Sequence, residues 1–371
     1  MLIQFHFPKC LKYLFLNSFF FALRKIIRDY LINYKDDPIM RLFTTYFGEM
    51  LSFFIYQYHK KIVLNTRKNN ANLKRITFRE GNYSNKNSND CLTKLKKKII
   101  PITIILCTVL DFFGIYNYNS HFTYEMKKLT IIYENINMIF LRFFIPFSEN
   151  YFLNIQTYIH HKIGLILMII PAVLIIVMNI YVILNIKIIS FLLIIIISLE
   201  SQAAESFLYS FEKKLNHEYF VSIYNICFLE GFFGMIILVI YLILFKFIFN
   251  TYKLFEITTI QQIMYIIGDI ICTLGFNVFR LKISEITKPS YNIIANFLAN
   301  FFFNISYILI QKETITKEMI ISTIFCSLGT MIFCEVMTLN FCDLDKNTNK
   351  QTIIRAILDL NQLNELSLNN K

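Results

Sequence analysis

Two long apolar runs between residues 190 and 249 constrain the fold more than any other feature of the chain. The first extends from Ser190 to Phe211 and the second from Val221 to Phe249. Each exceeds the roughly 20 helical residues that cross a hydrocarbon core about 30 Å thick. Because backbone groups in lipid need partners within their own segment, these runs predict membrane-spanning helices.

The same two runs contain carboxyl groups. Glu200 and Glu205 lie in the first run, and Glu230 lies in the second. A charge at the bilayer centre costs about 3 kcal/mol on the mildest insertion scale, so we expect these side chains to face protein or a water-filled cavity. Acids that recur along an apolar chain indicate a path for a solute rather than a simple anchor.

The composition is too apolar for a soluble domain. The 371 residues are 56% hydrophobic, with a mean hydropathy of +0.50, well above the usual range. The net charge of +12 does not indicate a nucleic-acid partner, because the basic residues cluster between the apolar stretches. None of the eight cysteines forms a Cys-x-x-Cys pair, so we expect them to be small core residues.

About ten apolar stretches have the length of a membrane helix, and we therefore predict an all-α integral membrane fold. The first stretch could also be read as a signal peptide, but an uncleaved helix is the preferred interpretation. The predicted spans are 11–33, 38–58, 99–118, 129–147, 162–184, 188–211, 220–249, 259–281, 289–310 and 318–341.

The distribution of basic residues predicts the topology. Segment 59–98 carries twelve Lys or Arg residues and two acids. The positive-inside rule therefore predicts a basic cytosolic loop. With ten spans, both termini are then cytosolic, and residues 342–371 form a polar cytosolic tail.

An internal similarity suggests that the chain is duplicated. Gly48-Glu49 is followed by Asp111, and Glu230-Gly231 is followed by Asp269 in the corresponding later spans. Two five-helix repeats, 1–187 and 188–341, would have inverted topology and a substrate site near the membrane midplane. Chance similarity in a biased composition is the alternative.

Polar residues inside the predicted spans are the candidates for a site. Asn292, Asn296 and Asn300 recur every four residues and so share one helix face. They could line a cavity or hydrogen-bond neighbouring helices. The candidate substrate-binding residues are Asp111, Glu134, Gln202, Asp269, Asn277, Asn292, Asn296 and Asn300, and the candidate structural or coupling acids are Glu49, Glu205 and Glu230.

Two further expectations concern charged and titratable residues near the spans. Arg142 should pair with a nearby carboxylate, because a lone cation is costly in lipid. His160 and His161 should lie in a solvated loop. The sequence contains no phosphate-binding glycine loop, no metal-spaced cluster and no Ser/His/Asp arrangement, so we expect no enzyme activity, cofactor or metal.

Several short motifs match one family. Residues 46–49 read Tyr-Phe-Gly-Glu, and Asp111 is followed three residues later by Gly114. The triplet 212–214, Glu-Lys-Lys, is followed eighteen residues on by the Glu-Gly-Phe-Phe-Gly of 230–234. Phe276-Asn277-Val278-Phe279 and Gly329-Thr330 complete the set. With these motifs, residues 11–341 resemble the drug/metabolite transporter superfamily and, within it, the F branch of solute carrier family 35, whose better-known relatives carry nucleotide sugars.

The resemblance implies a transporter that moves a small polar solute or metabolite by alternating access, in an endomembrane (Golgi, ER or lysosome-like) rather than the plasma membrane. Family arginine or aspartate positions fall on Glu134, Asn292, Asn296 and Ala299, which favours a neutral or cationic solute. The alternative is a non-transporting scaffold or receptor with the same fold. The expected partners are the solute and the lipid bilayer, with a homodimer left open.

Overall fold

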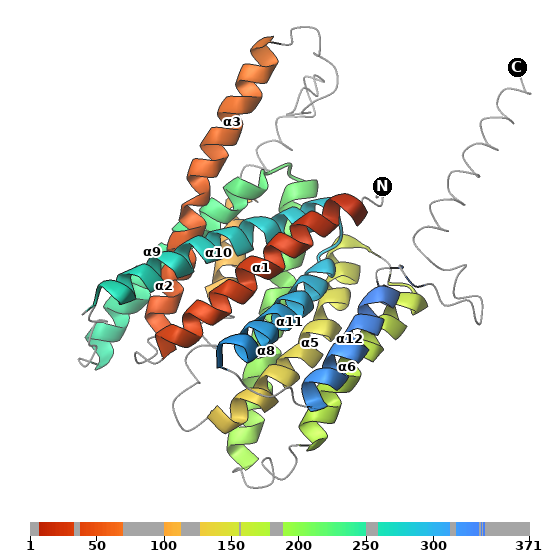
Figure 1. Ribbon diagram of the computed structural model, residues 1–371. Coiled ribbons are helices and arrows are strands. Elements are labelled where there is room, and N and C mark those ends of the chain that lie inside the picture. Colours follow the sequence, from red (N-terminus) through yellow and green to blue (C-terminus); the bar gives the residue numbers. More distant parts are fainter. Residues whose placement is uncertain are drawn as a thin grey trace, which may run out of the picture.

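The computed structural model is built from α-helices throughout its described part (Figure 1). It describes residues 7–32, 38–69, 100–112, 127–155, 157–178, 188–249, 259–311, 317–333, 335 and 337. Within these ranges no strand occurs, and the all-α prediction is confirmed. The predicted tail 342–371, and loop residues 70–98, lie outside the described part.

Each predicted apolar stretch is mainly helical where it is described, with non-helical residues at 51, 220–222, 259, 289–290, 335 and 337. The helices are α1 Phe7–Ile32, α2 Pro38–Met50, α3 Ser52–Asn69, α5 Lys127–Leu153, α6 Ile159–Met178, α8 Ile188–His217, α9 Ile223–Phe249, α10 Ile260–Ile286, α11 Tyr291–Gln311 and α12 Lys317–Phe333. A further apolar helix spans Ile100–Phe112.

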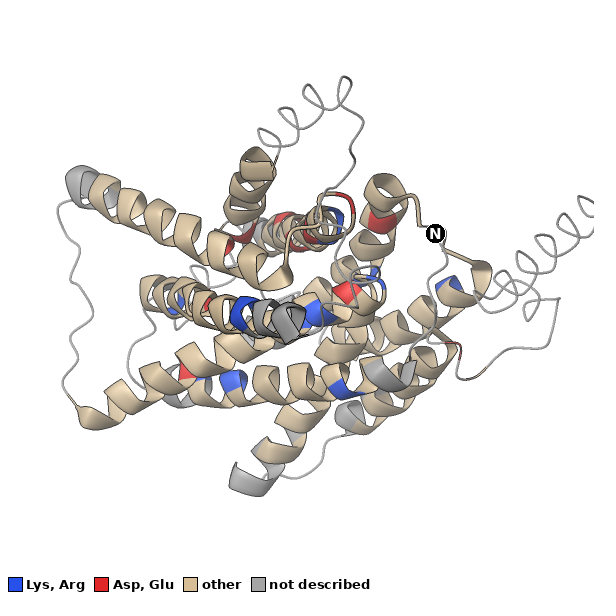
Figure 2. Cartoon of the chain, turned by 90° about the horizontal axis from the view of Figure 1, so that it is seen from above, with Lys and Arg blue, Asp and Glu red and all other residues tan. Residues whose placement is uncertain are grey.

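Three of these helices can cross a membrane by length and composition. They span Ile159–Met178, Ile223–Leu244 and Ile260–Ile286. Their outward side chains, such as Ile166 on α6 and Ile240 on α9, are large, apolar and exposed. An apolar outer surface of this extent is typical of contact with lipid, and long stretches of helix carry no charged residue (Figure 2).

The predicted span 38–58 is two helices rather than one. The chain turns at Leu51, between the end of α2 and the start of α3. The Ser52 hydroxyl donates to the Tyr224 carbonyl on α9 at 3.0 Å and fixes the turn. Beyond it, α3 projects from the bundle with Lys60 and Lys61 exposed (Figure 1). The continuous apolar pattern did not reveal this break.

Glycine residues allow two pairs of helices to pack closely. A Cβ atom at Gly164 on α6 would lie 2.8 Å from the Gly329 carbonyl oxygen on α12, and one at Gly329 would lie 2.6 Å from the Gly164 carbonyl oxygen. On α9, a Cβ at Gly231 would lie 2.6 Å from the Tyr46 carbonyl oxygen on α2. Such contacts leave no room for a methyl group, so glycine lets these backbones approach closely.

Hydrogen bonds fasten α1 to the second half of the chain. Asn17 donates through Nδ2 to the Phe276 carbonyl on α10 at 2.7 Å. The Ser18 hydroxyl donates to the Ala295 carbonyl on α11 at 2.9 Å. The five described cysteines that are free are all buried, as predicted for small core residues.

Candidate functional site

One face of α10 carries a polar stripe through the bundle. The helix begins at a capping box, in which Thr259 and Gln262 satisfy each other's backbone N–H groups. Buried polar residues then recur every three or four positions, at Asp269, Thr273, Asn277, Arg280 and Ser284, and so lie on one face. At 1.5 Å per residue the stripe is about 22 Å long, most of the hydrocarbon thickness.

At one end of the stripe, Asp269 binds two arginines of α1. Arg28 donates through Nε to Asp269 Oδ1 at 3.0 Å and through Nη2 to Oδ2 at 3.2 Å. The Thr44 hydroxyl on α2 donates to Oδ2 at 2.6 Å, and Arg24 Nε lies 3.7 Å from Oδ1. This bidentate, charge-assisted geometry is the strong form of an ion pair.

In the middle of the stripe, Asn277 donates through Nδ2 to Glu49 Oε1 at 2.5 Å. The Glu49 Oε2 atom has no hydrogen-bond partner among the described residues. Tyr46 is fully buried, and its hydroxyl group faces Asp111. A buried polar atom without a partner is unusual, so this part of the bundle is the candidate site.

Further along, Arg280 binds Glu212 of α8 with both ends of its guanidinium. Nη1 donates to Oε2 at 2.6 Å and Nη2 donates to Oε1 at 2.5 Å. The guanidinium also lies 4.8 Å from the centroid of the Tyr209 ring, within the range of a cation–π interaction. The Tyr209 hydroxyl in turn donates to Glu205.

These groups form one buried charge network with an excess of acids. Among the described residues it contains six carboxyl and three guanidinium groups, an excess of three acids. Each unpaired ion in a low-dielectric interior costs several kcal/mol, so protons or a bound cation would stabilise the network. Asp111, Glu205 and Arg28 are partly exposed, and the other members are buried. The members are Glu49, Asp111, Glu205, Glu212, Glu230, Asp269, Arg24, Arg28 and Arg280.

The structure brings together only some of the predicted site residues. Asp111, Asp269 and Asn277 join the network, as do all three predicted coupling acids. Asp269, however, is bound by arginines rather than held open for a substrate. Gln202 is buried on α8, and Glu134 lies in α5 with a side chain outside the described part.

The asparagine stripe of α11 makes contacts between helices. Asn292 donates to the Ser284 hydroxyl on α10 at 3.0 Å. Asn300 accepts a hydrogen bond from Lys25 on α1 at 3.1 Å, and Asn296 is buried. The stripe was predicted either to line a cavity or to hydrogen-bond neighbouring helices. The contacts of Asn292 and Asn300 support hydrogen bonding between helices.

Two predictions about single charges are wrong. Within the described residues Arg142 pairs with no carboxylate; it donates to the Met168 carbonyl and to the Cys326 sulfur at 3.6 Å, where α5 packs against α6 and α12. Glu200 is exposed on α8 rather than turned toward protein, because its face of the helix is the outer one.

The sequence analysis did not propose Arg24, Arg28, Glu212 or Arg280 as site residues, although Glu212 belongs to the 212–214 motif. Arg28 and Arg280 lie near the ends of predicted spans and Glu212 lies just beyond one, where a charge is not costly, whereas Arg24 lies inside span 11–33. The spacing of polar residues along α10 was a readable signal, since positions 269, 273, 277, 280 and 284 follow the helical period. Partners from α1 and α8 could not be read from any local pattern.

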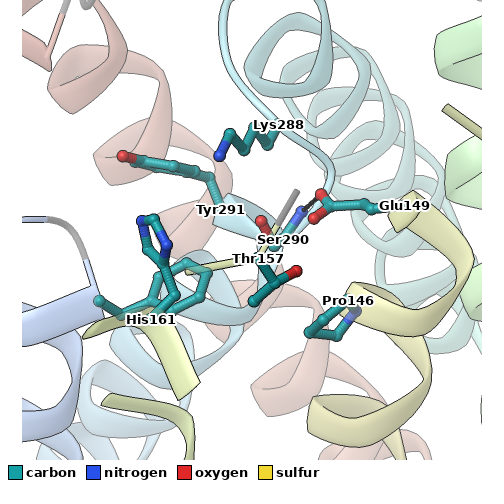
Figure 3. A pocket seen from close by; sticks show the side chains of 8 residues that line it. Pro146, Glu149, Thr157, His161, Lys288, Ser290 and Tyr291 are labelled. Atoms are coloured by element: carbon teal, nitrogen blue, oxygen red, sulfur yellow. Dashed lines mark hydrogen bonds between the residues drawn. The ribbon is translucent and has the colours of Figure 1, made fainter. Parts of the chain in front are cut away.

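A second polar cluster lies at the end of the bundle where α5 and α10 end and α6 and α11 begin (Figure 3). The Ser290 backbone N–H donates to Glu149 Oε1 at 2.5 Å. Burial lowers the pKa of the nearby Lys288 side chain. The cavity holds about 10 Å³, room for about one water molecule. It is lined by Pro146, Glu149, Thr157, His161, Lys288, Ser290, Tyr291 and Phe333.

The two adjacent histidines at this end are buried, which corrects the prediction of a solvated loop. His160 is 0% and His161 is 4% exposed. Asn154, with φ of 52°, ends α5 in the left-handed conformation that asparagine tolerates, and the chain then turns inward. His161 Nε2 lies 3.1 Å from Glu335 Oε1, beyond the end of α12.

No protein-family model matches the chain, and no curated protein matches it significantly. In the described residues, no group of three or more His, Cys, Asp or Glu side chains is arranged to hold a metal ion. Function is therefore inferred from the geometry of the buried charge network.

Proposed function

We propose that the chain is a secondary transporter that moves a small polar solute or metabolite across a membrane by alternating access. The observation that carries the proposal is the buried charge network. Ionisable residues inside a membrane bundle are expensive to keep, and they mark solute or proton pathways. Here they are spread over about 17 Å of α10, from Asp269 to Arg280.

The network lies between the two halves of the chain. Arg28 and Thr44, from the first half, bind Asp269 of the second half. Glu49 of the first half binds Asn277 of the second. In transporters built from repeats, the substrate site lies at the interface between the repeats, which is where these contacts occur.

The pairing of helices supports two inverted five-helix repeats. α1 runs parallel to α11, since Ser18 meets Ala295 and Lys25 meets Asn300. α5 runs parallel to α8, because Ser148 contacts Ser206 and Phe152 contacts the ring of Phe211. A two-fold axis that exchanges the halves would convert the α1–α11 pair into the α5–α8 pair, as an inverted repeat requires.

The other cross-half pairs fit the same axis. α6 and α12 run antiparallel around the Gly164–Gly329 contact, and each belongs to the fifth predicted span of its half. α2 and α9 run antiparallel around Gly231, and each is the second. Each of these pairs consists of two equivalent helices, so the two-fold axis passes between them and exchanges one helix for the other.

Two motifs of the proposed family lie against each other in space. A Cβ atom at Gly234 would lie 2.2 Å from the Tyr46 ring, so segment 230–234 packs on segment 46–49. This contact supports membership of the drug/metabolite transporter superfamily, close to the F branch of solute carrier family 35. The excess of acids in the network favours a neutral or cationic solute over a nucleotide sugar.

Topology and location follow from the same bundle. The start of α1 and the end of α12 share the end of the bundle that holds Lys288, because Cys10 lies 4.0 Å from Thr287 and Phe333 lines the same cavity as Lys288. We infer that this end, with both termini and the basic segment 59–98, faces the cytosol. An endomembrane is the proposed location.

The test is uptake of a panel of labelled polar solutes into proteoliposomes that contain the full chain. Asp269→Asn should abolish uptake, because it releases Arg24 and Arg28 from their shared partner. Glu218→Gln is the matched control, since Glu218 is exposed at the end of α8. Uptake that survives simultaneous Asp111→Ala, Asp269→Ala and Asn296→Leu would refute the site. No uptake by the wild type, with a stoichiometric protein partner, would favour the scaffold instead.

A further inference from the structure

Helix α3 projects out of the bundle and presents basic residues where it leaves (Figure 1). The ring of His59 lies against α9, with its centroid 5.6 Å from that of Tyr224. Because α9 begins at Ile223, one residue before Tyr224, Lys60 and Lys61 lie where the contact with α9 ends. Both lysines are exposed, and within the described ranges neither forms an ion pair.

Exposed aromatic residues precede these lysines on α3. Phe54 and Tyr58 are each 68% exposed, and the Lys60 ammonium group lies 6.0 Å from the centroid of the Tyr56 ring. Tyrosine is enriched where the hydrocarbon core of a bilayer meets the headgroups. Along the helix the order is therefore apolar ring, phenol ring and ammonium group, which is the order that a membrane favours from its core outward.

The spacing of these side chains matches the thickness of a headgroup layer. From Phe54 to Lys60 the helix rises about 9 Å, and the headgroup layer on one side of a bilayer is about 5–8 Å thick. With Phe54 at the edge of the hydrocarbon core, Lys60 reaches the level of the lipid phosphates. A lysine at that level can hold its ammonium group against a phosphate while its stem covers apolar surface.

The charge of α3 and its place in the bundle favour an anionic partner on the cytosolic side. The helix contains four Lys or Arg residues and no acid. Its start lies beside the start of α9, because Ser52 donates to the Tyr224 carbonyl. The end of α8, which leads into α9, lies beside the end of α10, since Lys213 donates to the Thr287 carbonyl at 2.8 Å. This is the end of the bundle that we infer to face the cytosol, and the cytosolic leaflet carries anionic lipids.

We propose that α3 binds anionic phospholipid headgroups of the cytosolic leaflet through Lys60 and Lys61, with Phe54 and Tyr58 as its anchor in the interface. The inference does not depend on transport. Charge complementarity selects an anion, and a basic cluster directly beside a membrane helix recognises anionic lipids. The order of side chains along α3 selects a lipid over a soluble acidic partner, because such a partner would gain nothing from rings placed beside the hydrocarbon core.

Binding of fluorescent short-chain phosphatidylserine to the detergent-solubilised full chain, followed by fluorescence anisotropy at low salt, tests the proposal. The wild type should bind it roughly 25-fold more tightly than phosphatidylcholine with the same chains, about fivefold for each lysine. Lys60→Gln with Lys61→Gln should lose most of this preference. The matched control is Lys12→Gln with Lys162→Gln, which removes two exposed lysines of α1 and α6 at the same end of the bundle and should keep the preference.

Two further arms separate charge from folding and a lipid from a soluble anion. Lys60→Arg with Lys61→Arg retains both charges and should keep the preference. Glycerophosphoserine, the soluble headgroup without chains, should not displace the lipid at equal concentration. Equal affinity of the wild type for the two lipids, or the same loss in the glutamine pair and in its matched control, would overturn the proposal. Displacement by glycerophosphoserine would assign the lysines to a soluble anion and overturn the lipid site.

Discussion

Replacing Arg280 with methionine should destabilise the protein strongly, because it removes the cation from a buried ion pair. Arg280 is 4% and Glu212 is 1% exposed, and two bonds of 2.6 Å and 2.5 Å join them. Removing one partner of such a pair leaves an uncompensated buried charge and costs about 3–5 kcal/mol. The double change Arg280→Met with Glu212→Leu should recover most of that loss, since no lone charge remains.

The assay is reversible unfolding of the detergent-solubilised full chain, followed by circular dichroism at a fixed pH. Lys214→Met is the control, because the Lys214–Glu218 pair spans 3.8 Å with side chains 33% and 54% exposed. Such a pair contributes about 0.2–1 kcal/mol at most. If Arg280→Met and Lys214→Met lower stability equally, the ion pair is not buried in the way described. A double variant as unstable as Arg280→Met alone would show that packing, not charge, causes the loss.

Two further predictions concern packing and protonation at the ends of α6, α10 and α12. Gly329→Ala should lower stability by about 1–3 kcal/mol, because its Cβ would lie 2.6 Å from the Gly164 carbonyl oxygen. Gly268→Ala, whose Cβ would meet only a flexible Ile27 methyl at 3.1 Å, should be tolerated in the same melting experiment. Burial lowers the pKa of Lys288 below its ordinary value of 10.5, so the unfolded chain binds more protons there. Wild-type stability should therefore rise relative to Lys288→Met as the pH increases toward 10.5, and a stability difference that does not change with pH on that approach would contradict the burial of the ammonium group.

The helical membrane fold was predictable because it depends on local properties. Apolar runs such as Phe191–Ile197 need no distant partner to exclude water or to satisfy their backbone groups. The same reasoning failed at Leu51, where α2 ends and α3 begins, since the apolar pattern continues across the turn. It also failed for His160 and His161, whose burial depends on how α6 packs against α12.

The candidate site was only partly predictable. Glu49, Asp111 and Glu230 stood out because a carboxyl group inside an apolar run is costly wherever it lies. The asparagines of α11 attracted attention through their spacing, but Asn292 and Asn300 bond to neighbouring helices. Arg28 and Arg280 were missed because their acidic partners, Asp269 and Glu212, lie far away along the chain.

The sequence by itself determined that this chain forms long apolar helices suited to a membrane and that a few acids are buried among them. Both follow from the free energy of moving each residue type from water into lipid, which is a local quantity. Only the tertiary structure decided which charges meet, such as Arg28 with Asp269 and Arg280 with Glu212, and that carboxyl groups outnumber cations where they meet. Electrostatic pairing depends on distance in space, and that distance is set by the packing of helices far apart in the sequence.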